Sequence, residues 1–192
     1  MKIITLDDFI DTYFKIIQRG NRFFFSKFTF NNEKRTMTAF DNTSFISSNF
    51  WSIPKVLERW NTLITGNVNI NYIEYLSQDF LKNKSELKLL SLGSGICNRE
   101  IELAEHSNLF KEVVCVDIAE NLLQIAARNA AKKNVCNIKF ITKNIYDFEF
   151  KENYYDIVFF KSSLHHFDKI ENFLSGKIKR TLKSDGLLII NE

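Results

Sequence analysis

From residue 87 onward, short apolar runs alternate with longer segments in which apolar residues recur every three or four positions. The short runs predict β-strands and the longer segments predict helices. Strands that alternate with helices are typical of a parallel sheet with crossover helices. The pattern predicts strands at residues 87–92, 113–117, 138–142, 155–160 and 187–190, and helices at residues 98–107, 119–133 and 169–182.

The first 85 residues follow a different pattern, with helices predicted at residues 5–19, 52–66 and 69–82. Between the first two helices, residues 21–50 are rich in phenylalanine and have β-like character. Most buried phenylalanines pack in a core or a covering layer. We therefore expect a helical and aromatic-rich cap over residues 1–85 and an α/β domain over residues 86–192.

Composition narrows the class of protein. The 192 residues are 45% hydrophobic, which is enough for a packed core, and the net charge of +3 comes from scattered lysines, so no nucleic-acid surface is expected. No membrane span is expected, because no run of 18 uncharged apolar residues occurs. The three cysteines lack CxxC spacing. They favour a reducing cytoplasm over a disulfide framework, and no metal site is expected.

The turn after the first predicted strand carries the most specific chemistry. Gly93 and Gly95 permit positive φ and let a ligand approach the backbone, while the following helix points N–H groups at the turn. Asp117 ends the next strand about 20 residues later, where a carboxylate can bind the ribose hydroxyls of a nucleotide. A dinucleotide fingerprint would place a third glycine at Asn98, so the turn argues against NAD.

Four segments in order, SLGSGIC, VVCVDIAENLLQIAARNA, YDIVFFKSSLHHF and LKSDGLLII, resemble the motifs of class I S-adenosylmethionine-dependent methyltransferases. The resemblance covers residues 87–192. It implies a Rossmann-like, doubly wound, mainly parallel sheet of the α/β class. It also implies S-adenosyl-L-methionine as cofactor and transfer of its methyl group. The N-terminal helices would then cover the cofactor and shape the substrate pocket.

The resemblance also implies roles for individual residues. The glycines would line the methionine end, Asp117 would bind the ribose, and Ile118 would pack against adenine. Asn144, where aspartate is more usual, can still accept a hydrogen bond from the adenine amino group. Lys161 and Ser162 would approach mostly through backbone atoms. The full set of expected cofactor contacts is Leu92, Gly93, Ser94, Gly95, Asp117, Ile118, Asn144, Ile145, Lys161 and Ser162.

The chain departs from the family pattern at two further positions. Ser91 stands where the family usually has an acid, and Cys97 stands where it often has a third glycine.

His165 and His166 follow the fourth strand and are the candidate catalytic residues, because imidazole exchanges protons near neutral pH. One or both could instead cap the next helix or line the pocket. Family members that methylate exocyclic amines of bases carry an Asn/Asp-Pro-Pro-aromatic signature here, whereas this chain reads KSSL. We therefore expect a small-molecule methyl acceptor.

The resemblance ends early, because the family continues past the fifth strand with a helix and an antiparallel strand pair. We expect a chain truncated after the fifth strand, with self-association through that strand's edge. Two alternatives stay open. One is a non-catalytic, methyltransferase-like binding or scaffold module, and the other is an NAD-dependent oxidoreductase.

Overall fold

The computed structural model describes residues 53–106 and 108–192, together with Leu6, Phe9, Ile10, Thr12, Tyr13, Phe14, Ile16, Ile17 and Phe25. The chain divides into two units, Met1–Ser47 and Ser48–Glu192. The described residues between positions 6 and 17 are helical, as predicted. Phe25, the single described residue of segment 21–50, is helical and not extended, because the strand preference of phenylalanine is weak and depends on context. The rest of that segment lies outside the described residues.

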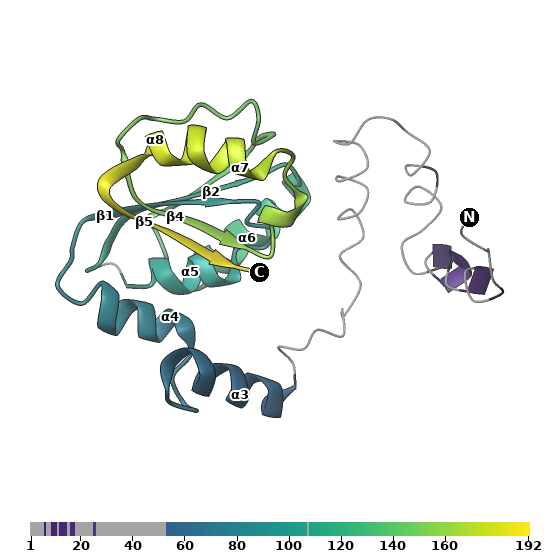
Figure 1. Cartoon of the computed structure of the whole chain (residues 1–192), viewed down its shortest axis with the longest axis horizontal. Coiled ribbons are helices and arrows are strands. Elements are labelled where there is room, and N and C mark those ends of the chain that lie inside the picture. Colours follow the sequence, from purple (N-terminus) through teal and green to yellow (C-terminus); the bar gives the residue numbers. More distant parts are fainter. Residues whose placement is uncertain are drawn as a thin grey trace. The chain divides into compact units, whose positions relative to one another are not determined.

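The elements of the second unit follow the predicted alternation (Figure 1). The N-terminal helices are α3 (Pro54–Thr65), α4 (Tyr72–Tyr75) and its π-helical continuation η2 (Leu76–Phe80). They are followed by β1 (Leu87–Leu92), α5 (Asn98–Ala104), β2 (Phe110–Asp117), α6 (Glu120–Lys132), β3 (Ile138–Thr142), β4 (Tyr155–Lys161), the 3₁₀ turn η3 (Leu164–His166), α7 (Ile170–Phe173), the π-helical turn η4 (Leu174–Ile178), α8 (Lys179–Thr181) and β5 (Leu182–Asn191).

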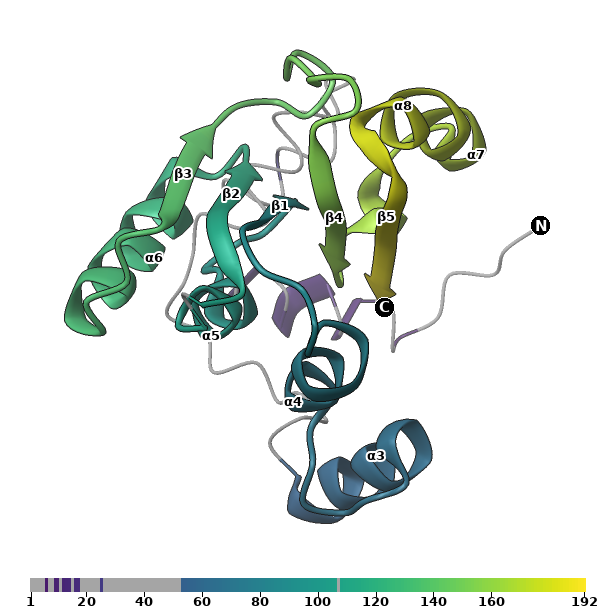
Figure 2. The ribbon, with the colours of Figure 1, turned by 90° about the vertical axis from the view of Figure 1, so that its left-hand side faces the viewer.

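The five strands form one sheet in the order β3-β2-β1-β4-β5, visible from end to end in Figure 2. All four neighbouring pairs are parallel, and β1 lies at the centre, where Leu90 is level with Val114 on one side and Val158 on the other. The chain passes from one half of the sheet to the other between β3 and β4. This arrangement confirms the predicted doubly wound, Rossmann-like α/β fold.

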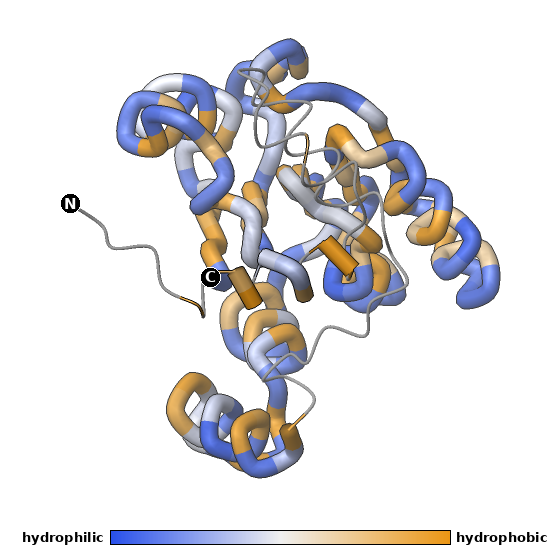
Figure 3. The backbone as a smooth tube through the Cα atoms, turned by 90° about the vertical axis from the view of Figure 1, so that its right-hand side faces the viewer, coloured by the Kyte–Doolittle hydropathy of each residue, from blue (hydrophilic) through white to orange (hydrophobic). Residues whose placement is uncertain are grey.

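Helices cover both faces of the sheet (Figure 1). On one face, α4, α5 and α6 pack against alternate residues of the central strands, including Leu89 and Phe159. On the other face, α7 and the segments next to it pack against residues such as Leu90 and Phe160. The helices alternate hydrophilic and hydrophobic stretches, as amphipathic covering helices should (Figure 3). Burial on both faces explains why the central strands read as continuous apolar runs.

The last strand is longer than predicted. The residues KSDG resemble a turn, yet they lie within β5, where the register jumps from Tyr155 opposite Leu182 to Ile157 opposite Leu187. The extra residues form an irregularity of the bulge type, which leaves the strand paired on both sides of it. Turn-forming residues alone do not reveal whether a strand ends or bulges.

Among the described residues, no helix combines the length and the apolar character needed to cross a membrane.

Candidate functional site

The carboxyl ends of β1, β2 and β4 bring the predicted site residues to one edge of the sheet. Because the strands are parallel, the glycine turn after Leu92, the carboxylate of Asp117 and the segment after Lys161 are neighbours at this edge. Open α/β sheets bind their ligands in such a position, next to the point where the strand order reverses. In this sheet that point lies between β1 and β4.

The glycine turn has the backbone geometry that its sequence predicts. Gly93 and Gly95 have φ of 68° and 55°, and Cys97 also adopts a left-handed conformation as it begins α5. The N–H of Gly93 donates to the carbonyl of Val116 at 2.8 Å, which ties the turn to the end of β2. A Cβ on Gly93 would lie 2.8 Å from the Cβ of Ser163, so the turn also packs closely against the segment after β4.

Asp117 binds the glycine turn directly. One carboxylate oxygen accepts the N–H of Gly95 at 2.7 Å, and the other accepts the N–H of Ala119 at 2.8 Å. A carboxylate has about four acceptor positions, so this half-buried group retains capacity for two more donors. The vicinal hydroxyls of a ribose would supply such donors.

Ser94 provides an independent test of whether the turn suits a polar ligand. Its Oγ is buried and makes no hydrogen bond of ordinary geometry in the described part of the chain, where its polar neighbour is the weakly interacting thiol of Cys115. A buried hydroxyl without a partner carries a free-energy cost, which a ligand group can remove. The backbone N–H groups, this hydroxyl and the Asp117 carboxylate therefore fit the polar adenosyl and amino-acid parts of the expected cofactor.

The side chains expected to contact adenine are mostly engaged within the protein. The Oδ1 of Asn144 accepts the N–H of Tyr146 at 3.0 Å, so this side chain organises its own turn. The side chains of Ile145 and Leu92 are buried in the core, which leaves their backbone atoms to face a ligand. Ile118 is half-buried directly after Asp117. These cofactor roles stay predictions.

Lys161 and Ser162 end β4 beside the glycine turn. Ser162 has φ of 50°, an unusual conformation for a non-glycine residue, and its hydroxyl accepts a hydrogen bond from the Lys161 ammonium at 2.9 Å. Burial lowers the pKa of Lys161, as does the charge of Arg99, whereas Glu100 and Glu192 oppose this shift. Lys161 thus lies within the electrostatic reach of two carboxylates.

His165 forms a pair with Glu192, a residue that the sequence did not single out. The Nδ1 of His165 lies 2.5 Å from Oε2 of Glu192, while Oε1 accepts the N–H groups of Ser163 and Leu164 at 2.9 and 2.8 Å. Burial would raise the pKa of Glu192, but these hydrogen bonds outweigh burial and lower it. The ionised carboxylate therefore orients the imidazole and leaves its Nε2 available.

His166 stacks near His165, with ring centroids 4.0 Å apart. Burial and the charge of His165 lower the pKa of His166, and the negative charges of Glu192 and Asp117 act in the opposite direction. Because η3 follows the carboxyl end of β4, both histidines lie at the same edge of the sheet as Asp117. No cluster of His, Cys, Asp or Glu suited to a metal ion occurs within the described ranges.

Glu100 is a second residue that sequence reasoning missed. It lies in the first turn of α5 and is 1% exposed, and its Oε1 accepts the hydroxyl of Ser91 at 2.6 Å. Burial raises the pKa of Glu100, while the Ser91 hydrogen bond and the cations Lys161 and Arg99 oppose the rise. Acids are common in the first turn of an amphipathic helix. The sequence therefore does not show that Glu100 is buried against Ser91.

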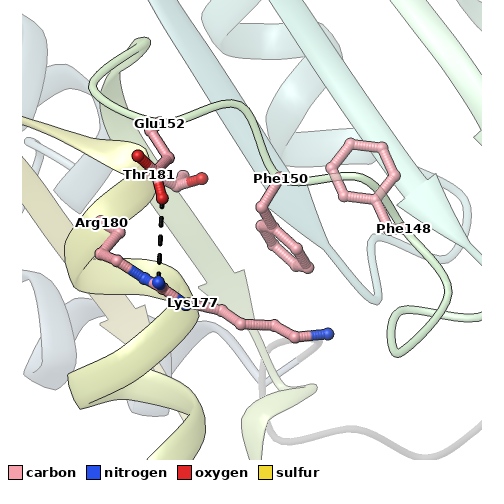
Figure 4. Close-up of a pocket in the computed structure, with 6 residues that line it drawn as sticks. All are labelled: Phe148, Phe150, Glu152, Lys177, Arg180 and Thr181. Atoms are coloured by element: carbon pink, nitrogen blue, oxygen red, sulfur yellow. Dashed lines mark ion pairs between the residues drawn. The ribbon is translucent and has the colours of Figure 1, made fainter.

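A separate hollow of about 200 Å³ lies at the other end of β4 and β5, where those strands begin. It is lined by Phe148, Phe150, Glu152, Lys177, Arg180 and Thr181, and Figure 4 shows the ion pair between Arg180 and Glu152, 3.8 Å apart. Its position opposite the carboxyl edge separates it from the glycine turn.

Comparison with known families gives a match over the same region. A family model described as a methyltransferase domain matches residues 83–192. A release factor glutamine methyltransferase from Francisella tularensis is 32% identical over 98 residues, which cover 50% of this chain and 34% of the relative. A demethylmenaquinone methyltransferase from Leptospira interrogans is 28% identical over 154 residues, which cover 76% of this chain and 59% of the relative. The chain thus spans between a third and three fifths of these relatives.

Solved structures share the fold. One is an S-adenosylmethionine-dependent methyltransferase from Thiobacillus denitrificans in complex with S-adenosyl-L-homocysteine. It aligns with a TM-score of 0.52 and 17% identity over 62% of this chain and 46% of that chain. At this level of identity, the likeness concerns the fold.

Proposed function

The chain belongs to the methyltransferase domain family, and we propose that it transfers a methyl group from S-adenosyl-L-methionine to a small-molecule acceptor. The observation that carries the proposal is the joint geometry of the glycine turn and Asp117, held together by the 2.7 Å hydrogen bond from Gly95. The solved relative in complex with S-adenosyl-L-homocysteine supports the choice of cofactor. The demethylmenaquinone methyltransferase, which aligns over more of the chain than the release factor enzyme, supports a small-molecule acceptor.

We assign the cofactor contacts predicted above to this site. Gly93, Ser94 and Gly95 would surround the methionine end, and Asp117 would bind the ribose. When bound, the cofactor supplies a methyl carbon that its sulfonium already activates. The chain mainly has to hold the two reactants in line, which can lower the barrier by about 7 to 11 kcal/mol.

His165 is the proposed general base. With Nδ1 directed at Glu192, its Nε2 can take the proton that the attacking atom of the acceptor loses as the new bond to carbon forms. His166, beside it, would assist in binding the acceptor or in proton exchange. A reducing cytoplasm is the proposed location, supported by the free thiols of Cys97, Cys115 and Cys136.

Isothermal titration calorimetry tests the proposed function. The chain is titrated separately with S-adenosyl-L-methionine, S-adenosyl-L-homocysteine and NAD. Binding of the first two but not of NAD is expected and would justify an acceptor screen. Binding of NAD alone would favour the oxidoreductase alternative, and absence of turnover with every acceptor would favour the non-catalytic module.

The role of His165 gives a first kinetic prediction, to be measured with an acceptor from that screen. Replacing His165 by Asn removes the base but keeps a polar side chain, so kcat should fall by about 10²- to 10⁴-fold. The dissociation constant of S-adenosyl-L-homocysteine should stay within about twofold, because the base does not bind the cofactor. An unchanged kcat would exclude His165 as the base.

A further inference from the structure

Glu100 is the only charged residue among the buried polar residues in the described part of the chain. Burying a carboxylate costs several kcal/mol unless other groups compensate the charge. The hydroxyl of Ser91 provides one strong hydrogen bond at 2.6 Å, yet no ion pair to Glu100 occurs within residues 53–106 and 108–192. A neutral or apolar side chain would fill this position at lower cost, so the carboxylate calls for a functional explanation.

The surroundings of Glu100 place this charge beside the glycine turn. Its partner Ser91 is on β1, two residues before Gly93, and is level with Phe159 on β4. Lys161 follows Phe159 by two residues, so it lies on the same face of the sheet, one step further toward the carboxyl edge. A negative and a positive group therefore flank the turn on the α5 face of the sheet.

The pairing with Ser91 also explains a departure in the sequence. The resembling methyltransferases usually have an acid at the position of Ser91, and here a helix residue brings a carboxylate to within hydrogen-bond distance of that serine. The negative charge is thus retained next to the turn, although the residue that supplies it comes from α5. Its action does not require direct contact, because charges interact over several ångströms in surroundings with little water.

We propose that Glu100 and Lys161 together select the amino-acid end of the cofactor, Glu100 providing the negative charge for its α-ammonium group and Lys161 the positive charge for its α-carboxylate. This inference rests on the proposed function. In this role Glu100 determines cofactor specificity through its charge, from a buried position next to the glycine turn. The alternative is that Glu100 only anchors α5 to β1, and an experiment has to distinguish this structural role from cofactor selection.

Calorimetry with three ligands separates the two roles. S-adenosyl-L-homocysteine carries both charged groups, its decarboxylated analogue carries only the amine, and 5′-methylthioadenosine carries neither. In Glu100→Gln, affinity for the first two ligands should fall by roughly tenfold or more, whereas affinity for methylthioadenosine should stay within about twofold. In Lys161→Met, only the affinity for S-adenosyl-L-homocysteine should fall.

Two further variants control for structural effects. Glu102→Gln changes an acid on the same helix that already pairs with Arg99 at 2.6 Å, and it should leave all three affinities unchanged. The double variant Ser91→Asp/Glu100→Ala moves the carboxylate onto the strand and should recover most of the affinity that Glu100→Ala loses. An anchoring role for Glu100 predicts no recovery.

The outcomes distinguish this inference from the proposed function. If the wild-type chain binds S-adenosyl-L-homocysteine and Glu100→Gln binds it equally well, the inference is wrong and the proposed function stands. The inference is also wrong if Glu100→Gln weakens all three ligands to the same extent. If the wild-type chain binds none of the ligands, the proposed function fails, and the inference fails with it.

Discussion

The carboxylate of Asp117 accepts backbone N–H groups from Gly95 and Ala119, so it organises the glycine turn as well as offering acceptors to a ligand. Both roles depend on the same oxygen atoms. A substitution at Asp117 is therefore expected to affect the shape of the turn and the hydrogen bonds to the ribose together.

Replacing Asp117 by Ala should weaken binding of S-adenosyl-L-homocysteine by about 1.5 to 3 kcal/mol, the usual contribution of hydrogen bonds to a charged group. Calorimetry measures this change directly. Asp185→Ala is the matched control, because Asp185 is exposed near the start of β5 and pairs only with Lys84 at 3.4 Å in the described structure. Equal affinity of the Asp117 variant and the wild type would contradict the assignment.

Glu100 gives a prediction for stability. Because burial raises the pKa of Glu100 above its value in the unfolded chain, ionising this carboxyl group costs more free energy in the folded chain than in the unfolded chain. As the pH rises from the pKa of Glu100 in the unfolded chain to its higher pKa in the folded chain, the unfolded chain loses its proton first, so the free energy of unfolding falls. Lys161 and Arg99 reduce this loss but do not reverse it. Glu100→Gln mimics the protonated form, so its melting temperature should exceed that of the wild type by an amount that grows with pH across this window.

Thermal melts between pH 4 and pH 8 test this prediction, with Glu102→Gln as the control that should show no such trend. A difference that shrinks as the pH rises would contradict it. A stability gain combined with weaker cofactor binding would show that Glu100 serves binding at the expense of stability.

Sequence reasoning found the residues whose signal is local. Gly93, Gly95 and Asp117 are recognisable because the turn and the strand end that position them lie in the same segment. The roles of Glu100 and Glu192 depend on Ser91, 9 residues away, and His165, 27 residues away. Glu192 meets His165 only once β4 and β5 are paired. Glu100 is close to Ser91 in the chain, but an acid in the first turn of an amphipathic helix resembles an ordinary exposed residue, so no spacing rule reveals either contact.

At the scale of the elements, the predicted strands and helices from residue 87 onward are present because apolar periodicity and element length agree. The boundaries differ where packing decides them. β2 begins three residues earlier than predicted, at Phe110, and the predicted helix at residues 69–82 is divided into α4 and the π-helical η2. The bulge in β5 was missed because its residues also suit a turn.

The contact between the glycine turn and the segment after β4 gives a prediction at this scale. A Cβ on Gly93 would meet Ser163 at 2.8 Å and would require φ of 68°, so Gly93→Ala should destabilise the fold by about 1 to 3 kcal/mol. Urea unfolding provides the measurement. Gly176→Ala is the matched control, because a Cβ there meets nothing within 4 Å, and this change should stabilise η4 by up to about 1 kcal/mol.

At the scale of the whole molecule, the doubly wound, mainly parallel sheet followed from the family resemblance and from the alternation of predicted strands and helices. The cap predicted over residues 1–85 and its boundary with the α/β domain stay predictions. Self-association through the β5 edge also stays a prediction, because the described structure contains a single chain. Exposed apolar residues on β5, Leu188 and Ile190 at 39% and 44%, are consistent with it.

Sedimentation velocity over a range of concentrations tests self-association. If the β5 edge mediates it, the wild-type chain should show a concentration-dependent increase in sedimentation coefficient, and Ile190→Lys should reduce that increase because a charge on an edge strand opposes pairing. Lys55→Ala, which changes an exposed lysine on α3, serves as a control. A single species at every concentration would exclude the interaction.

The central position of β1 also has a consequence for synthesis of the chain. The hydrogen bond from Lys88 on β1 to Asp156 on β4 spans 68 residues of sequence, whereas β2 follows β1 closely. At about 5 to 20 residues per second, a ribosome needs several seconds between completing β1 and completing β4. During this interval the apolar edge and faces of β1 lack half of their partners. We therefore expect the nascent chain to bind chaperones after β2 emerges and to be released once β4 completes the centre of the sheet.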